Sequence, residues 1–381
     1  MAICLSPGGT TIYSSQQLSS RLMVGTTQGV VTIDQVSPGA WRKTDQNLER
    51  HHVCALLQEP TSGRFVAGTH DAGIAVSDDG VNWQPANNGL TITNVYSLAV
   101  TQRDGHPVIY AGTEPAGLFI SEDLADSWNQ IESLAGASHA DTWTFPAPPF
   151  LGHIKTIKIN QNNSSEIYLS IEQGGLYRTR DAGKTWNELT EGMPNDVHRV
   201  EMSPDRPERL FVADGFFFNR SDDAGETWTE MADLIPRIGY ADQLVYHPNK
   251  PDTLIVAGGY ATPEAWASGS AKSAIYRTDN GGDSWQQSVS GLPNEVMPSF
   301  EAGCIEAAGQ AAQIFLADTH GQVWISNDEG LSWQQIIGDL PWVSKCFHAD
   351  LIHGDLVLRE EDIQIPDEMR EKMAEMVDRN S

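Results

Sequence analysis

Histidine and carboxylate residues recur in this chain at comparable points, either at the start of a short apolar run or in the turn after the next one. Four of them are candidate catalytic residues: His153, His198, Glu114 and Glu172. Histidines gathered in this way can hold a divalent metal that activates water or dioxygen. Alternatively, Glu114 and Glu172 form an acid and base pair while the two histidines orient a substrate.

Further polar and aromatic residues occupy equivalent points. The candidate substrate-binding residues are Lys155, Arg199, His70, Trp143, Tyr240, Asp242, Trp266 and His320. The candidate metal ligands are His52, His153, His198 and His348, with Zn, Fe, Cu or Mn as the expected cofactor. The sequence contains no HxH or HExxH spacing, so such ligands would have to come from separate parts of the chain.

A repeated octapeptide supplies the framework that must position these residues. Three copies fit S/T-x-D-x-G-x-S/T-W: Thr179 to Trp186, Ser221 to Trp228 and Ser326 to Trp333. Weaker copies end at Trp83, Trp128 and Trp285, and a degenerate one runs from Thr32 to Trp41. In this unit Asp accepts hydrogen bonds from its own turn, Gly supplies a positive φ and Trp packs on a neighbour.

The seven tryptophans follow one another at intervals of 42 to 58 residues, which is the period of a four-stranded propeller blade. We therefore predict an all-β chain with a seven-bladed β-propeller over residues 1–352. The first blade lacks an apolar run for its inner strand, and residues 342–352 are predicted to supply it and close the ring. Residues 353–381 form an extension, in which residues 366–377 read as a short amphipathic helix.

The topology of such a propeller determines where the candidate residues meet. If the octapeptides join the third and fourth strands at one end, the starts of the inner strands lie at the other, around the mouth of the channel. Two long insertions, residues 134–151 and 259–273, fall at that same end and are expected to act as lids or binding loops. The remaining interpretation is that the polar groups only line a wet channel.

The octapeptide resembles the BNR/Asp-box repeats of sialidases, xyloglucan-degrading hydrolases, sortilin-type receptors and photosystem assembly factors. The resemblance implies the propeller fold but no particular substrate, because in those families the box is structural. It also implies, for sialidases, three arginines and an Arg-Ile-Pro string near the start. Here the nearest string is Arg237-Ile238-Gly239 in mid-chain, so the sialidase arginine triad is not matched. The chain is more similar to bacterial glycosyl-hydrolase-like Asp-box propellers.

The composition of the chain limits the kinds of partner that the protein is expected to bind. The formal charge is −27, from 51 acidic and 24 basic residues, and disfavours nucleic acid and anionic membranes. The first twenty residues lack a basic start and a continuous apolar stretch, so a cytoplasmic location is expected. Four scattered cysteines read as reduced thiols. We expect a hydrolase or lyase, metal-dependent in one version, acting on a small polar or glycan-like molecule at the channel mouth. The alternative is a non-catalytic scaffold that binds a protein or peptide there.

Overall fold

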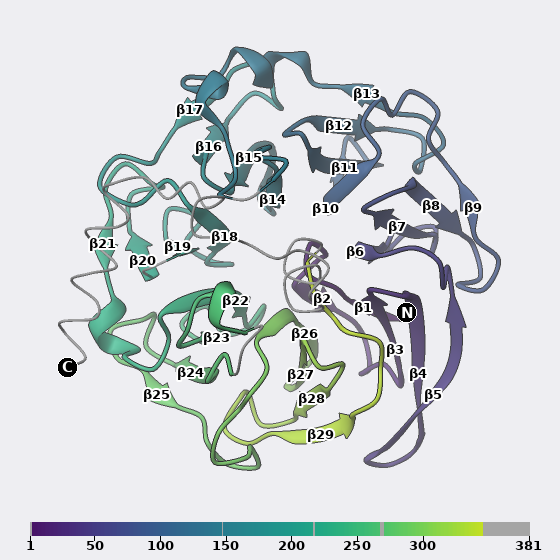
Figure 1. Ribbon diagram of the computed structural model, residues 1–381, viewed down its shortest axis with the longest axis vertical. Coiled ribbons are helices and arrows are strands. Elements are labelled where there is room, and N and C mark those ends of the chain that lie inside the picture. The colour runs from purple at the N-terminus through teal and green to yellow at the C-terminus, as the bar shows by residue number, and fades with distance from the viewer. Residues whose placement is uncertain (1, 147, 216–217, 267–269, 346–381) are drawn as a thin grey trace.

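The computed structural model describes residues 2–146, 148–215, 218–266 and 270–345. Their strands form seven separate sheets arranged around one axis, as Figure 1 shows. Six sheets have four strands and the seventh has five. The predicted seven-bladed β-propeller is confirmed.

The blades take the following strands, given from the channel outward. Blade one contains β1 (Ile3–Leu5), β3 (Arg21–Thr26), β4 (Gly29–Ser37) and β5 (Ala40–Asn47). Blade two contains β6 (Val53–Gln58), β7 (Phe65–Thr69), β8 (Gly73–Ser77) and β9 (Gln84–Pro85). Blade three contains β10 (Asn94–Arg103), β11 (His106–Glu114), β12 (Leu118–Ser121) and β13 (Asn129–Gln130). Blade four contains β14 (Ile154–Asn160), β15 (Asn163–Ile171), β16 (Gly175–Thr179) and β17 (Asn187–Glu188).

The remaining blades continue in the same order. Blade five contains β18 (Val197–Met202), β19 (Leu210–Asp214), β20 (Phe218–Ser221) and β21 (Thr229–Glu230). Blade six contains β22 (Tyr240–Tyr246), β23 (Leu254–Gly259), β24 (Ala274–Thr278) and β25 (Gln286–Gln287). Blade seven contains β26 (Phe300–Ala308), β27 (Ala311–Asp318), β28 (Val323–Ser326) and β29 (Gln334–Ile337), with β2 (Ile12–Ser14) added beside β26. Short helical turns are η1 (Glu132–Gly136), η2 (Ala140–Thr142), η3 (Ala232–Leu234) and α1 (Pro263–Trp266).

The octapeptides form the expected turns between the third and fourth strands of blades two to seven. In blade four, Asp181 accepts hydrogen bonds from the hydroxyls of Thr179 and Thr185, at 2.7 Å each, and from the backbone N–H of Thr185. The degenerate copy in blade one is different, because β4 and β5 pair continuously from Val30↔Asn47 to Ser37↔Ala40. Blade one therefore has a long hairpin in place of the turn.

The prediction that residues 342–352 supply the inner strand of blade one is wrong. β1 fills this position and pairs in parallel with β3, from Ile3↔Leu22 to Leu5↔Val24. Its three side chains are at most 1% exposed, so burial of this N-terminal apolar run holds the strand in place. Of the predicted closing strand, residues 342–345 form no strand, and residues 346–352 lie outside the described residues, as does the predicted helix at 366–377.

Residues 6–11, between β1 and β2, cross the channel and form what we call the plug. Gly8 donates its N–H to the carbonyl of Cys54 in blade two and accepts from the N–H of Leu98 in blade three. Thr11 donates its hydroxyl to Glu201 in blade five at 2.7 Å. A Cβ on Gly8 would overlap the carbonyl oxygen of Tyr96, so only glycine fits this approach. The plug separates the upper end of the channel, where the inner strands begin, from the lower end with the octapeptide turns.

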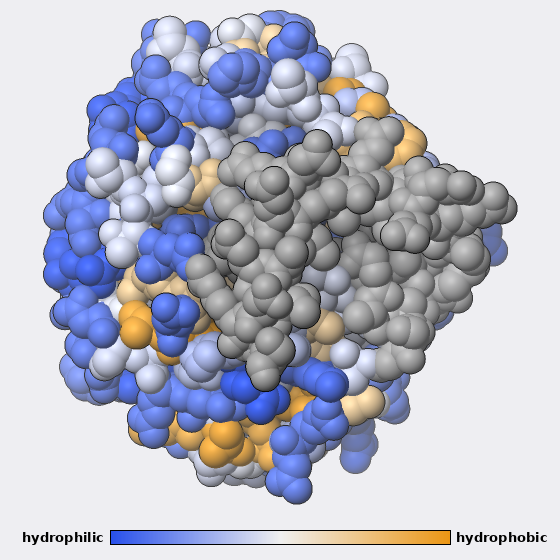
Figure 2. Space-filling model, turned by 60° about the vertical axis from the view of Figure 1, so that its left-hand side comes forward, coloured by the Kyte–Doolittle hydropathy of each residue, from blue (hydrophilic) through white to orange (hydrophobic). Residues whose placement is uncertain are grey.

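Apolar side chains fill the space between neighbouring blades, and they include Tyr110, Tyr168, Phe211 and Phe315, each fully buried. Outside the residues drawn in grey, the face in Figure 2 shows mostly hydrophilic side chains, with apolar ones in smaller patches. Within the described parts of the chain, no helix is both long and apolar enough to cross a lipid bilayer.

Candidate functional site

A β-bulge interrupts the start of the inner strand in six of the seven blades. In blade five, for example, Val197 pairs with Asp214 but Arg199 pairs with the adjacent Ala213, so His198 has no counterpart. A bulge residue leaves the regular alternation of the strand and re-aims its side chain. The six extra residues are Cys54, Tyr96, Lys155, His198, Asp242 and Glu301, and we call them the bulge ring.

Every member of the bulge ring carries a titratable group, and every one is at most 5% exposed. Blades four to seven contribute an ammonium, an imidazole and two carboxylates at structurally equivalent places. Burying charge is costly unless it is paired, so this arrangement is not explained by stability alone. The bulges thus bring several buried titratable groups together at the upper end of the channel. Such clusters are common at functional sites.

Glu172, in the turn after β15, is the centre of the cluster. Its Oε2 accepts a hydrogen bond from His153 Nε2 at 2.9 Å and lies 2.7 Å from the Lys155 ammonium. The other nitrogen of His153 lies 3.3 Å from Glu114 Oε2. One imidazole therefore links two carboxylates from neighbouring blades, and the aromatic rings of Tyr96 and Phe145 cover it at centroid distances of 4.0 and 5.2 Å.

The charges in this group determine each other's protonation. Burial alone would raise the pKa of Glu172, but the Lys155 ammonium and the His153 hydrogen bond hold it well below its usual range. The pKa of Glu114 is likewise lowered, since its interactions with His153 outweigh burial. Burial would lower the pKa of His153, but its two carboxylate partners raise it. The directions of these three pKa shifts favour the charged forms, which are an imidazolium and two carboxylates.

Lys345 extends the cluster towards blades six and seven. Its ammonium is paired with Asp242, and its backbone N–H donates to Glu301 Oε2 at 2.7 Å. Burial lowers the pKa of this lysine, and the nearby ammonium of Lys155 adds to the effect although Asp242 opposes it. Both lysines thus share Asp242, whose Oδ1 lies 3.9 Å from Lys155 Nζ.

His198 lies between Glu172 and a carboxylate that sequence reasoning missed. Its Nε2 is 3.5 Å from Glu172 Oε1 and 3.3 Å from Asp196 Oδ1. Neither approach has hydrogen-bond geometry. Asp196 was missed because it precedes the strand and lies in a loop, where an acidic residue is unremarkable. Tyr96 was missed because, without the bulge, it reads as an ordinary core aromatic.

The two insertions reach this end of the molecule. Phe145 from the first packs on His153, and Trp266 from the second packs edge-on against Tyr240 at 5.4 Å. Tyr240 in turn contacts the ring of His198 at 4.5 Å. Trp143 instead donates its Nε1 to the Tyr177 hydroxyl at 3.0 Å and supports the insertion from inside blade four.

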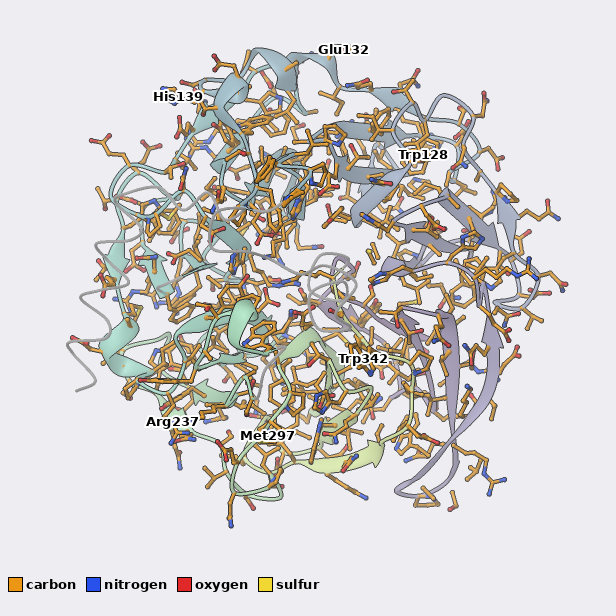
Figure 3. The ribbon with its side chains drawn as sticks, in the orientation of Figure 1. Trp128, Glu132, His139, Arg237, Met297 and Trp342 are labelled. Atoms are coloured by element: carbon orange, nitrogen blue, oxygen red, sulfur yellow. The ribbon has the colours of Figure 1, made fainter. Side chains whose placement is uncertain are left out.

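Several predicted site residues lie apart from the cluster. Arg199 points its guanidinium at the backbone carbonyls of Pro7 and Asp242 and so anchors the plug. His52 donates to the Ser344 carbonyl at 2.7 Å. His70 lies nearer, at the edge of the cluster, where its ring contacts that of Tyr96 at a centroid distance of 5.7 Å. Exposed His320 neighbours Trp342, a residue that Figure 3 labels between blades one and seven. Of the four proposed histidine ligands, His348 lies outside the described residues. The structure does not bring the other three together in one site.

Two further observations delimit the site. Arg237 and His139 both lie at the outer edge of the ring, as Figure 3 shows, so neither reaches the channel. At the lower end, a cavity of about 470 Å³ opens between the plug and the first turns of blades two, four, five and six. Its lining residues include Tyr13, Lys158, Asn162 and Pro248 and no member of the bulge ring.

The described residues define a seven-bladed β-propeller with a buried charged cluster at one end of its channel. A family model described as sortilin, neurotensin receptor 3, matches residues 174–294. A xyloglucanase from Paenibacillus sp is 24% identical over 218 residues, which are 49% of this chain and 21% of that protein.

Solved structures share the fold. A GH74 enzyme from Niastella koreensis superposes with a TM-score of 0.61 and 17% identity over 86% of this chain and 54% of that one. A structure described as YCF48 bound to D1 peptide gives a TM-score of 0.55 and 14% identity over 83% of this chain and 89% of that one. This chain thus spans about a fifth of the length of the xyloglucanase and about half of the GH74 enzyme.

Proposed function

We propose that the protein is a hydrolase that acts on a small polar or glycan-like molecule at the upper end of its channel. The observation that carries the proposal is the bulge ring, which places an ammonium, an imidazole and two carboxylates from adjacent blades in one buried patch. The likeness to a xyloglucanase supports a glycan-like substrate. The cytoplasmic location expected from the sequence stays a prediction.

The reactive group in this proposal is formed by Asp196, His198 and Glu172. Glu114 and Glu172 do not fit an acid and base pair, because the pKa of each is lowered and neither is a protonated acid at neutral pH. His198 Nε2 and Asp196 Oδ1 instead have no hydrogen-bond partner within the described structure, so either atom can take a proton from a water molecule that approaches the pair. The Asp196 side chain is 10% exposed, which makes it the point where this group meets solvent.

The test is release of reducing ends from xyloglucan and β-linked glucan oligosaccharides. Asp196→Asn removes a proton acceptor whose Oδ1 has no hydrogen-bond partner in the described structure, so we expect kcat to fall about 10²–10⁴-fold with little change in Tm. The matched control is Asp71→Asn, which alters an exposed carboxylate beside His51 at the same end and should leave kcat unchanged. Wild-type turnover that survives Asp196→Asn would contradict the proposal.

Peptide binding is the second candidate function. It is favoured by the structure of YCF48 with a bound peptide, because the two chains match over nearly their whole lengths. The aromatic anchors that a peptide would need are nevertheless not displayed, since Trp266 is 6% exposed and Trp143 is hydrogen-bonded inward. A folded protein that hydrolyses none of these glycans but binds peptides from a displayed library would favour this candidate.

A further inference from the structure

We infer that Asp196, His198 and Glu172 hold a divalent transition-metal cation, Zn²⁺ or Mn²⁺, at the upper end of the channel. This inference rests on the proposed function only where it gives the metal a role in turnover. Metal binding itself is measured without a substrate.

The tautomer of His198 is set by its surroundings. Nδ1 lies 3.3 Å from the backbone carbonyl oxygen of Ala241, which can only accept a hydrogen bond, so Nδ1 carries the proton. In the neutral ring Nε2 therefore presents a lone pair. A metal-bound histidine typically donates its other N–H to a backbone carbonyl or carboxylate in this way.

The lone pair faces two anions. Nε2 lies 3.3 Å from Asp196 Oδ1 and 3.5 Å from Glu172 Oε1, and His198 is fully buried. No donor in the described residues reaches either Nε2 or Asp196 Oδ1. His198 Nε2 and Asp196 Oδ1, which have no donor, lie close to each other and Nε2 lies close to Glu172 Oε1; such acceptors repel one another unless a proton or a cation lies between them. The buried, unpartnered imidazole nitrogen is the observation that points to a ligand.

The dimensions suit a small divalent ion. One ligand atom from each of the three residues can be chosen so that all lie within 4.8 Å of one another. Two ligands about 2.0–2.1 Å from a tetrahedral Zn²⁺ are about 3.3–3.4 Å apart, which agrees with the separations from His198 Nε2 to the two carboxylates. The imidazole favours Zn²⁺ over Mg²⁺ and Ca²⁺, which prefer oxygen alone, and the two carboxylates also suit Mn²⁺.

The surroundings also support the ligands. Glu172 Oε2 is occupied by His153 and Lys155, so its Oε1 is the atom directed at His198. Such outer contacts fix ligand orientation and tune the metal. With an ion bound, His198 Nε2 and Asp196 Oδ1 would be ligands rather than proton acceptors. Zn²⁺ would then lower the pKa of a bound water molecule to about 7, and this water would supply the nucleophile that a hydrolase needs.

The experiment is titration of the chelator-stripped full chain with ZnCl₂ and MnCl₂ by calorimetry, with metal content measured after dialysis. We expect one ion per chain, and an affinity at least about 10-fold weaker in both Asp196→Asn and His198→Gln. Asp71→Asn, beside exposed His51, is the control and should bind as the wild type does. Thermal melts establish that each protein is folded.

Two results would overturn the inference. One is a folded wild-type protein that binds neither ion in a one-to-one ratio. The other is binding that both Asp196→Asn and His198→Gln retain in full, which would locate the ion elsewhere. Metal binding without hydrolysis would uphold the site and contradict the proposed function. Hydrolysis that persists in the metal-free protein would uphold the function and exclude a role for the ion.

Discussion

Replacing Lys155 by methionine tests whether the buried cluster is electrostatically coupled. The Lys155 ammonium lies 2.7 Å from Glu172 and 3.9 Å from Asp242, and the three side chains are at most 6% exposed. Removing one partner of a buried pair costs about 3–5 kcal/mol, since the remaining charge is left uncompensated. His153 still contacts Glu172 and Lys345 still contacts Asp242, so we expect a value near 3 kcal/mol for Lys155→Met.

The cost of Lys155→Met depends on pH in a defined direction. The folded-state pKa of Glu172 is lowered, so its pairing adds stability above about pH 4.3 and loses it as the pH falls through the folded pKa. The pKa of Lys155 is raised because its carboxylate neighbours outweigh burial, so its contribution is full below about pH 10.4 and is lost above its folded pKa. The cost should therefore shrink in acid, below about pH 4.3.

Urea unfolding at pH 7 and pH 3.5 measures this cost. The control is Arg21→Gln, which breaks an exposed pair with Asp34 and should cost at most about 1 kcal/mol. If Lys155→Met costs no more than the control at pH 7, or if its cost is the same at both pH values, the cluster is not coupled as described.

Three further predictions concern the framework. Asp181→Ala should lower Tm, and more so at pH 6 than at pH 3, because the pKa of this turn carboxylate is lowered to about 2 by hydrogen bonds from Thr185 and Thr179; calorimetric scans at both pH values measure this. Gly8→Ala should cost about 1–3 kcal/mol in urea unfolding because its Cβ meets Tyr96, while Gly136→Ala, with open space at its Cβ, should cost little. Burial raises the pKa of Asp318 to about 7, so stability should fall as the pH rises from about 4 through 7, and the fluorescence of its partner Trp324 should change with a midpoint near pH 7.

The blades were predictable because each octapeptide is a local structure with its own hydrogen bonds. Because the octapeptide recurs with a nearly regular period, the number of its copies predicts the number of blades in the ring. The inner strand of blade one could not be found in this way, because β1 joins by a parallel pairing and carries no repeat signature. Residues 342–352 had an apolar pattern suitable for an inner strand. The sequence of one segment does not show which distant segment it pairs with.

The candidate site was partly predictable for a related reason. Aligning the repeats found His198, Lys155 and Asp242, since they share one position in successive blades. The bulge that makes this position special has a sequence signal that we did not use: Val197 and Val200 are three residues apart, where regular alternation requires two. Asp196 lies outside the repeated strands and was identified only by its distance from His198.

We infer that the bulge ring and its neighbours form a functional site at the upper end of the channel, in which His198 Nε2 is free to bind a metal ion. Anomalous diffraction from crystals of the full chain grown with Zn²⁺ tests this claim most directly. We expect one peak about 2.0–2.2 Å from His198 Nε2, from one oxygen of Asp196 and from one oxygen of Glu172. A map with no peak there, and an ordered hydrogen bond from a protonated Nε2 to Asp196 in its place, would contradict it.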